Sequence, residues 1–293
     1  MISSSLLLLA AIIWGFAFVA QRAGMEHVGP FFFNGVRFAL GTITLLPVLV
    51  IEHKRGAIAR SQPVPMRSVV LGCGSAGLAL FIAVSLQQIG MVYTTAGKAG
   101  FITGLYVVIV PLLGLLRKQR PGLNVWIGAV AAAAGLYLLS IRGAMGIELG
   151  DALVLVSAFG WAVHVHLVGW LAGKANPIVV ATLQFAICAI LSLVVTGASE
   201  VTALEGALRA GVAIAYAGFL SVGVAYTLQV VGQRHVDPSR AGIILSLEAV
   251  FAVFGGWLIL SEAMTPEMLA GCALMLAGML LSQLRTGRRS TDR

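Results

Sequence analysis

Glu248 is the one carboxylate that lies plainly inside an apolar run of this sequence. It follows Arg240 by eight residues, which in an α-helix places it about 12 Å along the axis. A lipid bilayer core is about 30 Å thick, so Glu248 would lie near its middle if the run crosses a membrane. A carboxylate there can contact a cationic group or exchange a proton, or it can be a protonated or helix-tethered structural residue. Both interpretations stay open.

Glutamine side chains recur at matched places in two other apolar runs. Gln87 and Gln229 lie 142 positions apart, and Gln88 adjoins the first of them. Buried amides can hydrogen-bond to a neighbouring helix or contact a polar ligand. A polar residue at both places favours a cavity that the two runs share.

Aromatic residues also occupy matched positions. Trp14 and Trp161 each lie about ten residues into an apolar run, which is too deep for the aromatic belt at a membrane surface. They therefore pack in a core or form the wall of a pocket. His164 follows Trp161 by one helical turn on the same helix face, where either a packing role or proton exchange is possible. Arg37 lies near one end of its run and is expected to extend its charge to the membrane interface.

Two cations stand at the start of apolar runs. Lys98 and Arg240 are again 142 positions apart, and Asp237-Pro238 is typical of a helix N-cap followed by proline in the first turn. The helix dipole disfavours cations in that turn. Lys98 and Arg240 therefore extend to lipid headgroups, or they bind the carbonyl end of the preceding helix and hold a gating hairpin shut.

These matched residues belong to an internal repeat. The stretch from Leu86 to Gly90 reads again from Leu228 to Gly232 at the offset of 142, and Tyr106 matches Glu248 at the same offset. Elsewhere the offset is 147 for the first two apolar runs and 143 for the fifth. The pairs with these two offsets are Trp14 and Trp161, Pro30 and Pro177, Arg37 and Gln184, Gly128 and Gly271, and Gly135 and Gly278.

The composition indicates a membrane protein. Of the 293 residues, 59% are hydrophobic and only 10% are charged, which is more apolar surface than a soluble globule of this size can bury. Runs of about 20 apolar residues predict transmembrane helices. Ten such runs are expected, at 3–21, 31–51, 68–90, 96–116, 122–141, 151–172, 177–198, 210–232, 240–261 and 266–284.

The positive charges between these runs predict an orientation. Fourteen Lys and Arg residues lie on the side of the N-terminus and four on the other, which places both termini in the cytoplasm. The net charge of +8 therefore reflects membrane topology, and no nucleic-acid partner is expected. The three cysteines lie within apolar runs and indicate neither a disulfide framework nor a metal site.

Five helices per half is an odd number, so the second half must enter the membrane from the opposite face. The sequence thus predicts an all-α integral membrane fold of two inverted-topology repeats, 1–145 and 146–293, in one membrane domain. Carriers that work by alternating access have this architecture, with the substrate site near the midplane between the repeats.

Several of these residues also carry a family resemblance. Leu247-Glu248, Glu262, Gly271 and Gly278 resemble the C-terminal signature of the EamA branch of the drug/metabolite transporter superfamily. Its first half is similar in Trp14-Gly15, Arg37-Phe38, Gly100-Phe101-Ile102 and Pro111. The resemblance implies a ten-helix carrier that exports small metabolites, with amino-acid exporters of the YddG type as the nearest kind. Ala249 stands where the family has a proline, so the sequence does not itself predict a bend there.

We therefore expect a bacterial plasma-membrane exporter of amino acids or similar small metabolites, not an enzyme. The alternatives are an exporter of drugs, nucleosides or sugars, and a channel of the same fold. The first, third, fourth, sixth, eighth and ninth helices would line the cavity, and the fifth and tenth would support it from outside. No cofactor and no metal are expected, and the protein would be a monomer or a weak homodimer. Lys98 and Arg240 are the candidate gating residues, and the candidate substrate-binding residues are Trp14, Gln87, Gln88, Phe101, Tyr106, Trp161, His164, Tyr226, Gln229 and Glu248.

Overall fold

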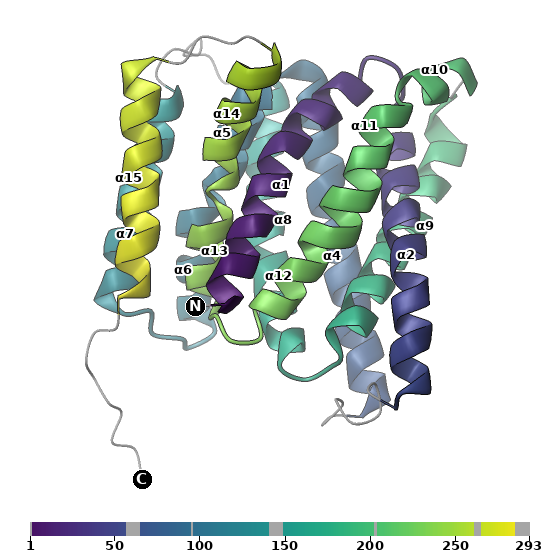
Figure 1. Cartoon of the computed structure of the whole chain (residues 1–293), viewed down its shortest axis with the longest axis horizontal. Helices are drawn as coiled ribbons and strands as arrows, with labels where there is room; N and C mark the ends of the chain where they lie inside the picture. The colour runs from purple at the N-terminus through teal and green to yellow at the C-terminus, as the bar shows by residue number, and fades with distance from the viewer. Residues whose placement is uncertain are drawn as a thin grey trace.

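The computed structural model describes residues 2–56, 65–94, 96–140, 149–201, 204–260 and 265–284, and within these ranges every regular element is a helix (Figure 1). In chain order the helices are α1 (Ile2–Gly24), α2 (Pro30–Lys54), α4 (Met66–Tyr93), α5 (Ala96–Gly104), α6 (Tyr106–Leu116), α7 (Leu123–Ser140), α8 (Leu149–Ala172), α9 (Pro177–Ser199), α10 (Leu204–Arg209), α11 (Gly211–Ala215), η1 (Tyr216–Tyr226), α12 (Thr227–Gly232), α13 (Pro238–Leu245), α14 (Glu248–Leu260) and α15 (Pro266–Gln283). Glu262 lies outside the described residues.

In the described part of the chain, eight helical segments are long and apolar enough to cross a membrane. Two further apolar helices, Leu123–Leu138 and Pro266–Ser282, are shorter. All ten coincide with runs expected from the sequence. The apolar side chains that these helices leave exposed are typical of surfaces that face lipid.

Two of the expected helices are interrupted at matching positions. The fourth run divides at Leu105 into α5 and α6, and the ninth divides at Ser246-Leu247 into α13 and α14. At each break the backbone forms i to i−3 hydrogen bonds, from Leu105 N–H to the Ile102 carbonyl (3.2 Å) and from Leu247 N–H to the Ile244 carbonyl (3.2 Å). Tight turns of this kind inside a helix are frequent at functional hinges. The helix break before Glu248 therefore forms without a proline at position 249.

The eighth expected helix is continuous but changes its winding. It begins as α11, becomes the π-helix η1 over eleven residues and ends as α12. A π-helical segment inside a longer helix often lies at a functional site. Ser221 and Tyr226, which face the cavity described below, belong to η1.

The helices α7 and α15 pack against each other at one edge of the molecule (Figure 1). A Cβ atom built on Gly128 would meet the Gly278 carbonyl oxygen at 2.6 Å, and one on Gly135 would meet the Gly271 carbonyl oxygen at 2.6 Å. The two backbones can approach this closely only because neither position has a side chain. Gly128 and Gly135 of the fifth apolar run are thus used for packing within the chain.

The helix α1 runs diagonally across the view in Figure 1 and contacts α14, η1, α12 and α13. In the rest of the bundle, α2 packs on α9 and α4 on α8. Residues of the first half of the chain therefore contact residues of the second half throughout the core. Trp14 on α1, Tyr106 on α6 and Tyr226 on η1 belong to the same buried cluster.

The N-terminus of α2 is capped by a distant side chain. Its own N-cap, Gly29, makes no side-chain hydrogen bond. Instead, the Glu200 carboxylate at the end of α9 accepts hydrogen bonds from the backbone N–H groups of Phe31 (2.9 Å) and Phe32 (2.7 Å). An anion at this position also interacts favourably with the positive end of the helix dipole. Glu200 thus joins α2 to α9.

We expect Glu200→Ala to lower the free energy of unfolding by about 1–2 kcal/mol, because two N–H groups lose their acceptor and the dipole loses its anion. The midpoint of thermal unfolding in detergent measures this. Glu205→Ala is the control, since Glu205 is exposed and only pairs with Arg209 one turn later on α10 (2.7 Å), a contact worth about 0.5 kcal/mol or less. Equal losses in the two variants would contradict the capping role of Glu200.

Candidate functional site

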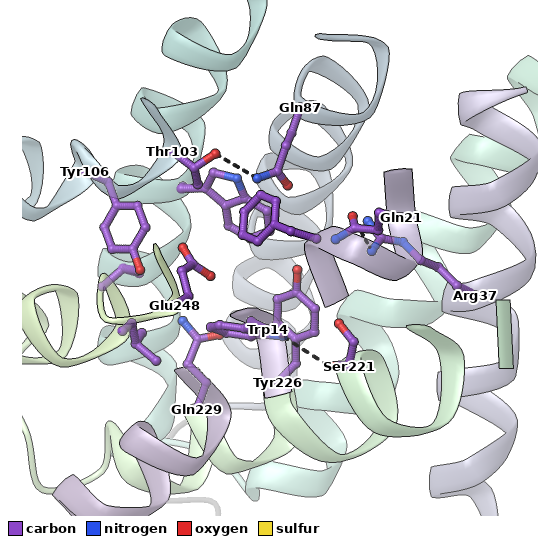
Figure 2. Close-up of a pocket in the computed structure, with 14 residues that line it drawn as sticks. Trp14, Gln21, Arg37, Gln87, Thr103, Tyr106, Ser221, Tyr226, Gln229 and Glu248 are labelled. Carbon is purple, nitrogen blue, oxygen red and sulfur yellow. Dashed lines mark hydrogen bonds between the residues drawn. The ribbon is translucent and has the colours of Figure 1, made fainter. Parts of the chain in front are cut away.

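A cavity lies among the helices, at the level of the two helix breaks (Figure 2). Its lining comes from α1, α2, α4, α5, α6, α8, η1, α12, α13 and α14. The fifth and tenth apolar runs, α7 and α15, contribute no lining residue. The second run, which was not among the expected lining helices, reaches it through Arg37.

Ten of the lining residues form pairs at the two main offsets of the repeat. Two pairs are separated by 147 positions and three by 142. These pairs are Trp14 and Trp161, Phe18 and Val165, Gln87 and Gln229, Thr103 and Leu245, and Tyr106 and Glu248. Both halves of the chain therefore supply the same positions to one cavity.

Tyr226 is the centre of the aromatic wall. Its ring centroid lies 4.6 Å from that of Trp14 and 6.1 Å from that of Trp161, with the Trp161 ring stacked at an interplanar angle of 19°. The Trp14 indole Nε1–H donates to the Ser221 carbonyl oxygen of η1 (3.2 Å). The Trp161 Nε1–H has no hydrogen-bond partner within the described structure. This wall thus combines a large apolar surface with one unused donor.

Glu248 is the first residue of α14, and its side chain faces the cavity (Figure 2). Only 6% of the residue is exposed. Tyr106 is the first residue of α6, and its side chain faces the Glu248 carboxylate and interacts with it. The two helix breaks thus bring a phenol and a carboxyl group, matched in the repeat, to one side of the cavity.

Both repeated glutamines face the cavity, each in a different way. The Gln87 Nε2 donates to the Thr103 hydroxyl (2.8 Å), which connects α4 to α5. The Gln229 Oε1 accepts no hydrogen bond within the described structure. Gln87 therefore combines interhelical bonding with a place on the cavity wall, and Gln229 keeps an acceptor available.

Arg37 lies inside the protein, and the expectation that it reaches the membrane interface is wrong. It is 1% exposed, because its Nε donates to Asn34 Oδ1 (3.0 Å) and its Nη1 to Gln21 Oε1 (2.8 Å). The guanidinium also lies over the rings of Phe33 and Phe38, at 5.6 and 5.0 Å from their centroids. These contacts hold the side chain towards the cavity, where it borders the lining (Figure 2).

Three of the expected binding residues do not line the cavity. His164 lies behind the wall, where its Nε2 hydrogen-bonds to Gln184 Oε1 (2.9 Å) and its ring meets the Trp161 ring edge-on at 5.8 Å. Gln88 is fully buried elsewhere on α4, and Phe101 is half-buried against the apolar core. The other seven expected residues, Trp14, Gln87, Tyr106, Trp161, Tyr226, Gln229 and Glu248, lie together on the cavity.

The two expected gating cations differ in what the structure describes. Asp237 is the N-cap of α13, as the sequence predicted: its Oδ1 accepts from the Arg240 backbone N–H (3.1 Å). The Arg240 Nε lies 3.5 Å from Asp237 Oδ2, so Arg240 pairs within its own first turn, and among the described contacts none joins its side chain to the carbonyl end of α12. Lys98 belongs to α5, and its side chain lies outside the described residues.

Several lining residues did not emerge from the sequence alone. Phe18 and Gln21 follow Trp14 by four and seven positions and therefore share its helix face, so the helical period could have indicated both. The offset of 142 pairs Thr103 with Leu245, although only one of the two is polar. For Arg37 and Ser221 we find no equivalent signal, because their place depends on how α2 and η1 pack.

The comparisons with known proteins agree with this architecture. The model of the EamA-like transporter family matches residues 1–141 and again residues 148–284. An uncharacterized transporter of Archaeoglobus fulgidus is 31% identical over 281 residues, 95% of this chain and 85% of the relative. The uncharacterized transporter YoaV of Bacillus subtilis is 24% identical over 303 residues, 95% of each chain.

Two further comparisons concern location and fold. YedA of Escherichia coli, named as an uncharacterized inner membrane transporter, is 28% identical over 156 residues, 52% of this chain and 48% of the relative. A crystal structure aligns with a TM-score of 0.77 at 20% identity over 96% of both chains, which shows a shared fold. The relatives are transporters and not enzymes. The doubly matched family model, the transporter relatives and the shared helical architecture lead to one conclusion: the chain belongs to the EamA-like transporter family.

Proposed function

We propose that this transporter is a secondary carrier that exports amino acids or similar small metabolites across the bacterial inner membrane by alternating access. The observation that carries the proposal is the central cavity, to which the two parts of the chain contribute matched residues. Carriers built from repeats bind their substrate at such an interface, where interrupted helices meet. The interruptions before Tyr106 and Glu248 lie at that place.

In this proposal the ten apolar helices form two five-helix repeats, 1–145 and 146–293, inverted with respect to each other. The pairs of lining residues support the repeats, and so do the close contacts between α7 and α15 at equivalent glycines. The excess of Lys and Arg on one side supports cytoplasmic termini. The N-terminus and the end of α2 lie towards the same side of the molecule (Figure 1). Several of these cations follow α2 in the sequence.

The cavity suits a small molecule with both polar and apolar parts. Aromatic rings form one wall, and a carboxyl group, a guanidinium and three amides reach it from other sides. An amino acid has a charged amine, a carboxylate and a side chain that match these three kinds of surface. Lys98 and Arg240, at the starts of α5 and α13, stay candidate gating residues.

A counterflow assay tests the proposal. Purified protein in liposomes preloaded with unlabelled amino acid should accumulate the labelled form transiently, with a rate that saturates. A panel of amino acids, nucleosides, sugars and drugs in the same assay identifies the substrate class. Counterflow of another solute and of no amino acid would contradict amino-acid export, and uptake that neither saturates nor shows counterflow would indicate a channel.

A further inference from the structure

Arg37 is a buried cation with one hydrogen-bonding nitrogen unused. Its Nε and Nη1 donate to Asn34 and Gln21, whereas Nη2 has no acceptor within the described structure. The residue is 1% exposed and borders the cavity. A guanidinium donates through all three nitrogens and is suited to planar anions such as carboxylates. Nη2 is thus a donor without a described partner, on a residue that lines the cavity.

The charge of Arg37 is not neutralised by a described carboxylate. No ion pair found among the described residues includes Arg37, and its two polar partners are amides. Glu248, the carboxyl group of the cavity, faces Tyr106, and Figure 2 shows Glu248 and Arg37 in separate parts of the lining. A buried charge in a membrane protein is costly without a counter-charge, so an anion that enters the cavity would be stabilised there.

The matched residue in the second half helps to distinguish the structural role of Arg37 from the role of its charge. The matched position in the second half is Gln184. Gln184 joins α9 to α8 through His164 (2.9 Å), just as Arg37 joins α2 to α1 through Gln21 (2.8 Å). A neutral amide thus links the corresponding pair of helices in the second half, although through its oxygen and to a partner at a different position. A link between these two helices does not itself require a positive charge, so the charge of Arg37 is free for another role, and this points to a ligand.

We propose that Arg37 binds the carboxylate of the transported solute through Nη2. This inference rests on the proposed function, since it names the group by which an amino acid is recognised. The aromatic wall around Tyr226 then receives the side chain of the solute, and Glu248 lies on the side of the amine. Solutes that lack a carboxylate lose the charged hydrogen bond to Arg37 and are carried poorly.

The test compares matched probes in the counterflow assay. Leucine, methionine and phenylalanine are each paired with the carboxamide of the same amino acid, in which a neutral amide replaces the carboxylate. With the wild-type protein, we expect each amino acid to compete at least about tenfold better than its carboxamide. This is the effect of one charge-assisted hydrogen bond in a buried site. Arg37→Gln should bring the ratio of acid to amide competition close to one, because it weakens binding of the acid and leaves binding of the amide unchanged. Arg37→Lys should restore part of the preference for the acid.

Two controls separate binding from folding. The thermal midpoint of Arg37→Gln shows whether the variant folds, and Arg37→Lys, which keeps the charge, serves as the second variant. Arg234→Gln removes a cation that donates to the Ala172 carbonyl (3.0 Å) outside the cavity lining, and should leave the ratio of acid to amide unchanged.

The outcomes are distinct. If wild-type protein carries acids and amides equally well, or if Arg37→Gln keeps the full preference for acids, the role of Arg37 is wrong and amino-acid transport still stands. If wild-type protein carries neither acids nor amides, the proposed function itself is wrong, and the carboxylate site with it.

Discussion

Glu248→Gln is expected to reduce counterflow of an amino acid by about tenfold or more. Among the described residues, Glu248 is the one carboxylate in the lining of the cavity, and it begins the half-helix α14 beside Tyr106. The substitution keeps the size and hydrogen-bonding capacity of the side chain but removes its charge. An electrostatic contact in a site shielded from water is worth far more than one at a surface. The initial rate of counterflow in liposomes, at matched amounts of reconstituted protein, measures the loss.

The same variant distinguishes two roles for Glu248. If it binds the substrate amine, Glu248→Gln should raise the KM for leucine but not for the 2-oxo acid of leucine, which has no amine. If it carries a proton through the cycle, both solutes should be affected alike, and the dependence of the rate on pH should disappear. Tyr106→Phe is the companion variant, with a smaller expected loss because Tyr106 only faces the carboxylate. An unchanged rate and an unchanged pH profile in Glu248→Gln would exclude both roles.

Among the substitutions proposed for this protein, Gly135→Leu is expected to cause the largest loss of folded protein. A Cβ at this position already meets the Gly271 carbonyl oxygen at 2.6 Å and the Met275 Cγ at 2.7 Å. The first of these atoms is backbone, so α7 and α15 must move apart to admit any side chain. Overpacking of this kind costs about 1–3 kcal/mol, and the lost contacts between the helices add to it. The yield of monodisperse protein in detergent and its thermal midpoint measure the effect.

Gly74→Leu provides the matched control for Gly135→Leu. Gly74 lies on α4, and a Cβ built there meets nothing within 4 Å. The same added side chain should therefore leave the thermal midpoint nearly unchanged, or raise it because leucine favours a helix more than glycine does. Because α7 and α15 do not line the cavity, the surviving fraction of Gly135→Leu should keep its KM. A large change in KM with normal stability would show that this helix pair acts on the site directly.

Much of the membrane architecture could be predicted from the sequence, for a physical reason. A bilayer admits backbone only as helices of about 20 apolar residues or as closed barrels, so the apolar runs alone located the helical segments. A duplicated sequence keeps corresponding residues at a fixed offset. The offsets of 142 and 147 therefore selected Trp14, Trp161, Gln87 and Gln229, which the structure brings to one cavity.

The sequence was less informative where the direction of a side chain decides its role. Position along a run does not tell which neighbour a helix face meets. His164 and Gln88 were expected on the cavity because they adjoin Trp161 and Gln87, yet the packing of α8 on α4 and α9 places them away from its lining. The gating role of Arg240 required a contact with the carbonyl end of the preceding helix. In the structure Arg240 instead pairs with Asp237, three residues earlier in the same turn.

Glu248 shows how the two kinds of information divide. By itself the sequence determined that this carboxyl group lies deep in an apolar run and that Tyr106 is its counterpart, because depth depends only on residue count and correspondence only on the repeat. Only the tertiary structure decided that both helices break just before these residues, since the breaks replace some regular helical hydrogen bonds with i to i−3 bonds that the packing around them must support. It likewise decided that Arg37 turns inward. Its guanidinium donates to Asn34 Oδ1 one turn earlier on α2 and to Gln21 Oε1 on α1, so its direction depends on where the packing places Gln21.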